Sequence, residues 1–427
     1  MKIAFATVGS RGDIQPILVL ALLFKKHLQQ KNKECEFVFV THRNQQKWIE
    51  SYGFDFEPIT ICIDEVAQKP EVAELIVKGQ TLKFSQAVMT KEGMESIGMD
   101  LFKGCEGCDM IVTSGTTTIN MLHIAEKYNA KLVVVSLGEM HPTSESLPMF
   151  QGSAPFGFIN RFGHFAFRKL MWSTCKDMVN GFRKRLDLPT ISEQEYHTRA
   201  DALPCFCAYS PYISPKPHDF PDNVLVGGFL FMETNGGLVD ELESFLTSKT
   251  NVVYIGFGSM PAQVTTKFWH LVNQVVDQAP TDWNFIIYIG STKTGFENLK
   301  SNTKVFLLTG APHDLLFPRC DVVVHHGGAG TTASAFKAGR PQVICAFFAD
   351  QPFWARKIAA LGVGPKSPLS FSTTTAKELV SAIKEVMELT CVEKAKQIRD
   401  IVLKEQKESK AVDWLYNCFF PEPIDSA

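Results

Sequence analysis

The loop His325-His326-Gly327-Gly328-Ala329-Gly330-Thr331-Thr332 has the residue types and spacing of an anion-binding loop. The apolar run Asp321–Val324 before it predicts a buried strand, and the small residues after it predict a helix that ends at Gly339. Glycines allow the backbone to turn tightly and to approach a ligand closely. The first amides of a helix are unpaired and lie at the positive end of its dipole. The loop therefore predicts an anion site, and phosphate suits such a site.

Side chains of this loop add hydrogen-bonding groups to its amides. We expect His326 and the Thr331 hydroxyl to contact the anion, and His325 to be a satisfied histidine at the end of a strand. A second glycine loop, Gly256–Met260, follows another apolar run and offers amides and the Ser259 hydroxyl. Alone, it is equally consistent with a purely structural turn. Neither a Gly-x-Gly-x-x-Gly nor a Gly-x-x-x-x-Gly-Lys-Ser/Thr motif accompanies it.

A carboxylate and a carboxamide stand side by side at Asp350-Gln351, after the apolar run Gln342–Ala346. Together these groups can accept hydrogen bonds from the hydroxyls of a sugar and donate to them, which is what pyranose recognition requires. The alternative is that Asp350 caps a helix that starts near Pro352.

The elements that must position these loops alternate between short apolar runs and helical patterns, which predicts parallel sheets covered by helices on both faces. The chain is therefore an α/β protein with two doubly wound, Rossmann-like halves. Their loops after Val8, Phe257, Val324 and Ala346 should converge on one cleft, because ligands bind at the carboxyl ends of such strands. The expected strands are Lys2–Val8, Glu36–Thr41, Met110–Thr113, Lys131–Ser136 and Val224–Val226 in the first half, and Asn251–Phe257, Asn284–Ile289, Lys304–Leu308, Asp321–Val324 and Gln342–Ala346 in the second.

Changes in composition suggest where the domains begin and end. We expect a first domain at 1–228, a linker at 229–249 and a second domain at 250–403. A charged helix at 404–427 should pack back on the first domain. The segment Met140–Leu203 breaks the strand and helix alternation, and its aromatic and basic residues predict helical or irregular structure.

Composition excludes some partners and keeps others open. The chain has 427 residues and a net charge of -2, which gives no general attraction to nucleic acid. The chain has 33 Phe residues, many of them in the first half, and they predict an apolar ligand pocket, an apolar surface or simply a Phe-rich core. We expect a cytoplasmic protein, with peripheral membrane contact as an alternative, because we find neither a signal peptide nor a spanning segment. The eleven cysteines are expected to be reduced.

The motifs, in order, resemble those of UDP-sugar-dependent glycosyltransferases with the GT-B fold. His325–Thr332, Ala338–Pro341, Phe347–Trp354 and Leu361–Pro365 match the donor-binding signature of that clan. Within the clan the chain most resembles the sterol 3-beta-glucosyltransferases. Their opening motif is similar to Val8–Pro16, and a further motif is similar to Ala311-Pro312-His313-Asp314 with Leu316–Arg319.

The resemblance implies roles for individual residues. The pyrophosphate of the donor would be held by Ser259, His326, Gly328, Gly330 and Thr331, and its base by the backbone around Pro312 and His313. Asp350 and Gln351 would bind the transferred sugar. Asp13 would be the general base for the acceptor, at a position where many relatives use histidine, with Ser10 and Arg11 in the same acceptor-side loop. Ser334 stands where the clan often has a ribose-binding glutamate, which leaves both UDP and TDP open.

The activity that the resemblance implies is inverting transfer of a hexose, glucose first, from a UDP-sugar to a lipophilic alcohol, a sterol first. Such a transfer needs a base on one side of the anomeric carbon and a stabilised diphosphate on the other. The chain has no Asp-x-Asp motif, so we expect neither a metal nor a cofactor, the UDP-sugar being a substrate. The local alternative for Asp13 is a helix cap. Another apolar aglycone or a glycolipid, a sugar-nucleotide epimerase and a non-catalytic nucleotide-sugar-binding subunit remain alternatives.

Overall fold

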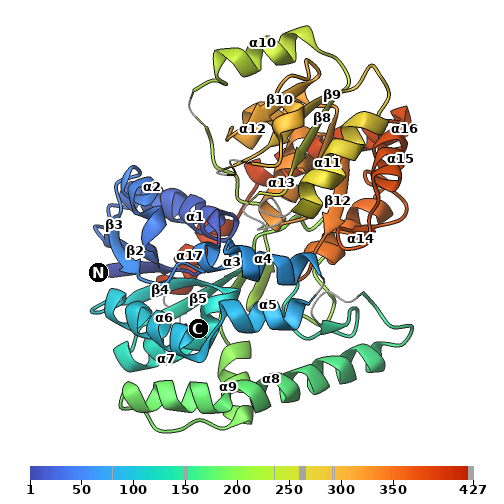
Figure 1. Ribbon diagram of the computed structural model, residues 1–427. Coiled ribbons are helices and arrows are strands. Elements are labelled where there is room, and N and C mark those ends of the chain that lie inside the picture. The colour runs from blue at the N-terminus through green and yellow to red at the C-terminus, as the bar shows by residue number, and fades with distance from the viewer. Residues whose placement is uncertain are drawn as a thin grey trace. The chain divides into compact units, whose positions relative to one another are not determined.

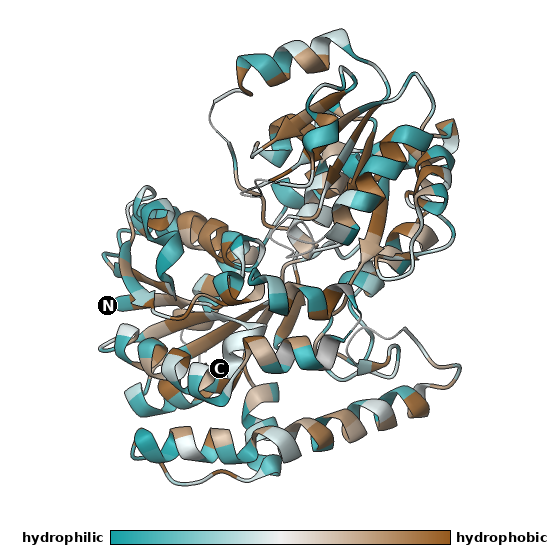
Figure 2. Ribbon diagram, in the orientation of Figure 1, coloured by the Kyte–Doolittle hydropathy of each residue, from teal (hydrophilic) through white to brown (hydrophobic). Residues whose placement is uncertain are grey.

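The protein is described by a computed structural model that covers residues 1–78, 80–148, 152–234, 236–258, 266–290, 292 and 294–421 (Figure 1). Contacts between residues divide the chain into two compact units. Unit 1 comprises Met1–Ile63, Met89–Leu230 and Glu405–Ala427, and unit 2 comprises Asp64–Val88 and Phe231–Lys404. Each unit is built on one parallel sheet whose strands are hydrophobic (Figure 2), as expected of strands that are covered on both faces.

Unit 1 has a seven-stranded sheet in the order β3-β2-β1-β4-β5-β6-β7, and every neighbouring pair is parallel. Its order reverses at β1, so the loops after β1 and β4 lie at the topological switch point where α/β sheets bind ligands. The strands are β1 (Lys2–Ala6), β2 (Glu36–His42), β3 (Asp55–Ile59), β4 (Met110–Ser114), β5 (Lys131–Ser136), β6 (Cys205–Cys207) and β7 (Val224–Val226).

Helices cover both faces of this sheet. On one face, Leu101, Met121 and Phe182, from three different helices, pack with strand residues such as Val38 and Ile111. Elsewhere in unit 1, α1 contacts α17, and Phe24 lies 6.0 Å from Phe419 between ring centres. The helices of unit 1 are α1 (Arg11–Gln30), α2 (Gln46–Glu50), α6 (Lys91–Gly104), α7 (Thr118–Tyr128), α8 (Gly157–Arg185), α9 (Glu193–Asp201) and α17 (Ala411–Phe419).

Unit 2 has a six-stranded sheet in the order β10-β9-β8-β11-β12-β13. Its strands are β8 (Val252–Gly256), β9 (Asn284–Tyr288), β10 (Val305–Leu308), β11 (Val322–His325), β12 (Gln342–Ala346) and β13 (Leu369–Ser370). Its helices are α3 (Ile63–Ala67), α4 (Pro70–Val77), α5 (Thr81–Val88), α10 (Asp240–Ser248), α11 (Thr266–Gln278), α12 (His313–Leu316), α13 (Ala329–Ala338), α14 (Gln351–Ala360), α15 (Ala376–Val386) and most of α16 (Leu389–Lys407).

The two α/β sheets and all ten expected strands are confirmed, with small differences at their ends. Three further strands, β3, β6 and β13, were not predicted, because Asp55–Ile59 has polar residues at alternate positions and the other two are very short. Among the described residues, no helix combines the length and the apolar character needed to cross a bilayer.

Two segments differ from the domain limits expected from the sequence. Residues 64–88 were placed in the first domain, but they group with unit 2 because Ala67, Ile76 and Phe84 form a cluster with Phe347 and Phe348. The expected linker, 229–249, contains α10, which packs Leu242 and Leu246 into the core of unit 2. The segment from Glu405 groups with unit 1, through α17.

Candidate functional site

The imidazole of His326 lies between the two glycine loops of unit 2. A Cβ atom added at Gly328 would lie 2.5 Å from His326 Nε2, and one added at Gly258 would lie 3.1 Å from His326 Cε1. Gly258 also has a φ of +58°, in the left-handed region that favours glycine. The loops after β8 and β11 are therefore shaped around this ring. Ser259 and Met260, the next residues of the first loop, lie outside the described residues.

The imidazole of His326 is neutral, and one of its ring nitrogens is buried without a hydrogen-bond partner among the described residues. Burial, and secondarily the charge of His313, lower the pKa of His326 to about 4. The Nδ1 atom is buried and has no hydrogen-bond partner among the described residues. A buried polar atom without a partner is costly, and such atoms are found where a ligand, an ion or a water completes the site. At neutral pH the ring offers one donor and one acceptor.

His325 has the structural role that the sequence predicts. Its Nε2 atom lies 2.9 Å from Gln342 Oε1, and Gly327 donates its backbone N–H to Nδ1 at 3.1 Å. Both ring nitrogens are thus satisfied inside unit 2. Burial, followed by the charge of His326, lowers the pKa of His325 to about 3, so this ring is also neutral.

Helix α13 begins directly after this pair of histidines. Gly328 is its N-cap and has no side chain to satisfy the first amides, so the amides of Ala329, Gly330 and Thr331 stay available to a ligand. The hydroxyls of two other residues turn back to the helix instead. Thr332 donates to Gly328 O at 3.0 Å, and Ser334 donates to Gly330 O at 2.9 Å.

Asp350 and Gln351 come together at the start of α14, next to the same loop. Asp350 Oδ2 accepts a hydrogen bond of 3.0 Å from Trp354 Nε1, and Gln351 Oε1 accepts one of 2.8 Å from the Phe347 amide. A Cβ atom at Gly327 would lie 3.2 Å from Gln351 Cβ, so the start of α14 packs directly against the loop between β11 and α13. The structure brings the pair close to the loop, with the Gln351 oxygen already bonded to backbone.

Pro312 and His313 open the short helix α12, with Pro312 as its N-cap. The His313 ring stacks on Phe317 with 4.2 Å between ring centres and 15° between planes. It also meets Tyr254 of β8 edge to face. His313 is therefore held by aromatic contacts. It is near enough to His326 for its charge to lower the pKa of that ring.

Asp13 lies in the first turn of α1 in unit 1, as part of a capping box. Its Oδ2 atom accepts hydrogen bonds from Ser10 N at 2.8 Å and from Ser10 Oγ at 3.0 Å. Burial raises the pKa of Asp13, while the Ser10 hydrogen bonds oppose this. The helix-cap alternative is thus realised in the structure, and both bonds use the same oxygen. Arg11 turns away and lies over the ring of Trp48 at 4.5 Å.

Two neighbours shape the loop that carries Asp13. Gly9 has a φ of +139°, and a Cβ atom there would lie 2.5 Å from Asp13 Oδ2. The Gly9 amide donates to His42 Nε2 at 3.1 Å, from the end of β2. His42 was not predicted, although its place at the carboxyl end of an apolar run is a signal that could have found it.

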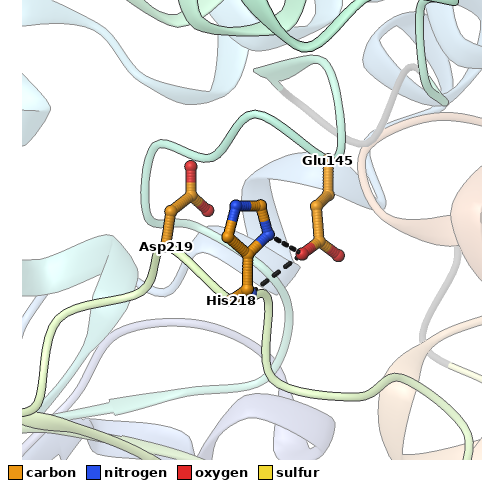
Figure 3. A group of neighbouring side chains, drawn as sticks. All are labelled: Glu145, His218 and Asp219. Atoms are coloured by element: carbon orange, nitrogen blue, oxygen red, sulfur yellow. Dashed lines mark hydrogen bonds and ion pairs between the residues drawn. The ribbon is translucent and has the colours of Figure 1, made fainter.

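The structure also brings together Glu145, His218 and Asp219, a group that was not predicted from the sequence (Figure 3). Glu145 Oε1 lies 2.6 Å from His218 Nδ1, and the three residues offer ligand atoms within 4.8 Å of one another. However, the Asp219 carboxylate already accepts hydrogen bonds from Thr143 and from the Arg161 guanidinium. With a guanidinium bonded to the only buried carboxylate, the group is better suited to fastening a loop than to holding a cation.

Models of known protein families match segments of both units. Residues 3–134 match the family described as glycosyltransferase family 28 N-terminal domain, and residues 274–415 match the erythromycin biosynthesis protein CIII-like, C-terminal domain. The glycotransferase of kitacinnamycin shares the fold with a TM-score of 0.71 at 15% identity, over 98% of this chain and 99% of that one. The chain has the GT-B fold of these glycosyltransferases.

Sequence relatives of this GT-B chain carry a consistent name. A sterol 3-beta-glucosyltransferase of Arabidopsis thaliana is 30% identical over 98% of the chain, and one of Komagataella phaffii is 29% identical over 97%. The chain spans 65% and 34% of the lengths of these two relatives. Among solved GT-B structures, the glycosyltransferase VinC in complex with DTDP has a TM-score of 0.60 at 16% identity, with 97% of this chain and 99% of that one covered.

Proposed function

We propose that this GT-B chain transfers glucose from UDP-glucose to the hydroxyl of a sterol, with inversion at the anomeric carbon. The observation that carries the proposal is the neutral His326, held between Gly258 and Gly328, the N-cap of α13, with a buried Nδ1 atom that has no hydrogen-bond partner among the described residues. The name shared by its sequence relatives supports the choice of sugar and acceptor.

The diphosphate of the donor binds at the start of α13. Amides of the first turn and the helix dipole stabilise its negative charge, and the hydroxyl of Thr331 and the ring of His326 add hydrogen bonds. As the bond between the sugar and the diphosphate breaks, charge develops on the departing oxygen. Preorganised donors at this point lower the barrier without a metal, because they need no reorganisation during the reaction.

The transferred sugar binds beside this loop, at Asp350 and Gln351. The carboxylate of Asp350, oriented by Trp354, accepts hydrogen bonds from sugar hydroxyls. Gln351 keeps the loop after β12 in place through its oxygen, so its role is to hold the site as well as to contact the sugar. The packing of Gln351 against Gly327 links sugar recognition to the position of the phosphate loop.

Asp13 removes the proton from the acceptor hydroxyl. Its Oδ2 atom is fixed by Ser10, which directs the carboxylate and leaves Oδ1 to accept the proton. The acceptor oxygen then forms its bond to the anomeric carbon while the bond to the diphosphate breaks, and UDP leaves. A pKa raised by burial makes the carboxylate a better base than an exposed aspartate, whose pKa is ~3.9.

The proposal is tested by incubating the protein with UDP-glucose or TDP-glucose and a panel of sterols, phenolics and glycolipids. We expect a sterol glucoside by mass spectrometry, formed faster from UDP-glucose, with a β linkage by NMR. Release of UDP without any glycoside across the panel would count against the transferase. Conversion of the UDP-sugar without an acceptor would identify an epimerase, and UDP binding without turnover would identify a binding subunit.

A further inference from the structure

The N-terminal half of helix α8 in unit 1 is inverted, with polar side chains facing the protein and apolar ones facing outward. Asn160 and His164 are only 1% and 8% exposed, four residues apart. Asn160 bonds to Ser144 O and Ala154 N at 2.8 Å each, and His164 Nε2 lies 3.0 Å from Ser146 O. A helix on the surface of a soluble protein normally shows the opposite arrangement.

The outward side of the same turns is aromatic. Phe158, Phe162 and Phe165 are 72%, 67% and 58% exposed, at the spacing of one helical stripe, and Phe156 beside them is 60% exposed. We call these four residues the aromatic face. Their rings contact one another in pairs. The ring centres of Phe156 and Phe158 lie 5.8 Å apart, and those of Phe162 and Phe165 lie 6.5 Å apart. Exposed apolar patches of this kind mark binding surfaces.

Several polar contacts hold α8 with this side outward. The Arg161 guanidinium bonds to Asp219 at 2.8 Å, and Arg168 makes two bonds to Asp201, at 2.8 and 2.6 Å. Towards its C-terminus, α8 buries Val179 and Phe182 in unit 1. Rotating the helix to bury the aromatic face would break all of these contacts. The exposure is therefore a built feature of unit 1.

Charge along α8 indicates what covers the aromatic face. The whole chain has 43 basic and 45 acidic residues, but α8 has seven Lys or Arg and one Asp. Five of these basic side chains are paired with carboxylates of other segments, and among the described residues Lys176 and Lys184 are not. The hydrophobic residues lie towards its N-terminal half and the hydrophilic ones towards its C-terminus (Figure 2). Lys169 and Lys176 continue the stripe of Phe158, Phe162 and Phe165 at helical spacing. Lys169 is bonded to Glu193 at 2.9 Å, whereas Lys176 is exposed and has no carboxylate partner among the described residues. The same face thus changes along its length from aromatic to cationic.

We propose that the aromatic face docks α8 on the surface of a lipid bilayer, with Lys176 against anionic headgroups. A bilayer presents hydrocarbon next to a charged layer, which matches this sequence of side chains along one face. A protein partner would need hydrogen-bonding groups across the contact. Between Phe156 and Phe165 the charged side chain is Arg161, which is already bonded to Asp219.

Docking would give unit 1 direct access to acceptors dissolved in the membrane, a consequence that rests on the proposed function. The docking itself does not depend on that function. The two are therefore tested separately, one by binding and one by turnover.

Binding is measured by co-sedimentation of the full chain with phosphatidylcholine vesicles, with and without phosphatidylserine. We expect Phe158→Ser/Phe162→Ser/Phe165→Ser to weaken binding on the order of 100-fold, because each Phe loses its burial in the bilayer. The matched control is Leu23→Ser/Val239→Ser/Leu389→Ser, which removes three other exposed apolar side chains and should bind like the parent. Lys176→Gln should weaken binding about fivefold, with phosphatidylserine only.

Equal binding by the aromatic-face variant and the parent, or no binding by the parent to either vesicle, would overturn the docking. So would a concentration-dependent dimer that the triple Phe variant abolishes without any vesicle binding, because the occupant would then be a second copy. Glucoside formation from sterol carried by cyclodextrin should be unchanged in the variant and reduced for sterol in vesicles. A parent that binds vesicles but glucosylates no soluble sterol would contradict the proposed function and leave the docking intact.

Discussion

Gly328 lies so close to His326 that a Cβ atom there would be 2.5 Å from the imidazole Nε2. The His326 ring is therefore packed against the backbone of the loop between β11 and α13. Because a methyl group at 2.5 Å cannot be accommodated, Gly328→Ala should move the ring and lower kcat/KM by about tenfold or more. The control is Gly237→Ala, which adds a methyl group where no atom lies within 4 Å. Steady-state kinetics with unchanged turnover in Gly328→Ala would show that the ring position does not matter.

The ring of His326 should matter more for the reaction than for binding. We expect His326→Ala to lower kcat by on the order of 100-fold, the size seen when a donor to a developing charge is removed. The dissociation constant for UDP, measured by calorimetry, should rise much less, because the ground state carries less charge on the departing oxygen. Should UDP binding fall as far as kcat, the loop would be a docking site alone.

One substitution can separate the proposed role of Asp13 as a base from its place in the capping box. Asp13→Asn keeps an oxygen that can accept from Ser10, so the capping box and the melting temperature should stay near those of the parent. Turnover should fall by about a thousandfold or more, because the amide is not a base. A variant that is equally stable and still active would assign Asp13 to the helix cap alone.

The pH profile should also report Asp13. Its pKa is raised by burial, and the base must be deprotonated to act. Activity is therefore present at neutral pH and is lost as the pH falls through a value above the ordinary pKa of ~3.9. His326, with a pKa of about 4, stays neutral down to that value, so no separate inflection near pH 6.5 is expected in kcat/KM. An inflection near 6.5 would require a charged histidine in the free enzyme.

His42 should position the acceptor-side loop through the Gly9 amide. His42→Ala removes the acceptor of that N–H and should lower kcat by about tenfold, with little change in the KM for UDP-glucose. His42→Gln supplies a carbonyl oxygen and should restore part of the loss. If both variants lose stability to the same extent and recover no activity, His42 is simply a core residue.

We expect the reaction to be independent of metal, because the proposed mechanism stabilises the diphosphate with helix amides and His326. Incubation with excess EDTA should leave the initial rate within about a factor of two, because no step of the proposed reaction uses a metal. Mg²⁺ added back should give no further increase. Loss of turnover in EDTA that Mg²⁺ restores would contradict this account of the leaving group.

Much of the fold and part of the candidate site can be predicted from local sequence. Apolar runs locate the main strands, and the place of His326 between a strand and a helix follows from its neighbours alone. The packing of His326 against Gly258 could not be predicted in the same way, because it joins two loops far apart in the chain. The assignment of Asp64–Val88 to unit 2 depends likewise on contacts of Phe84 with Phe348.

The inverted face of α8 shows a second limit. The spacing of Phe158, Phe162 and Phe165 indicates that they share one side of a helix, but the same spacing would fit a side turned into the core. The choice is made by Asn160 and His164, whose partners at Ser144 and Ser146 precede the helix. Hydrogen bonds of single polar residues decide the orientation, and periodicity does not contain them.

The contact between α17 and α1 has a consequence for how the protein is made. Helix α1 carries Asp13 near the start of the chain, and α17, near its end, contributes Phe419 to the packing around Phe24. The Phe419 carbonyl also accepts a hydrogen bond of 2.7 Å from Lys131 of β5. A ribosome synthesises the segments of unit 2 before it reaches α17. Unit 2 can therefore complete its core first, and the unit that begins the chain finishes folding last.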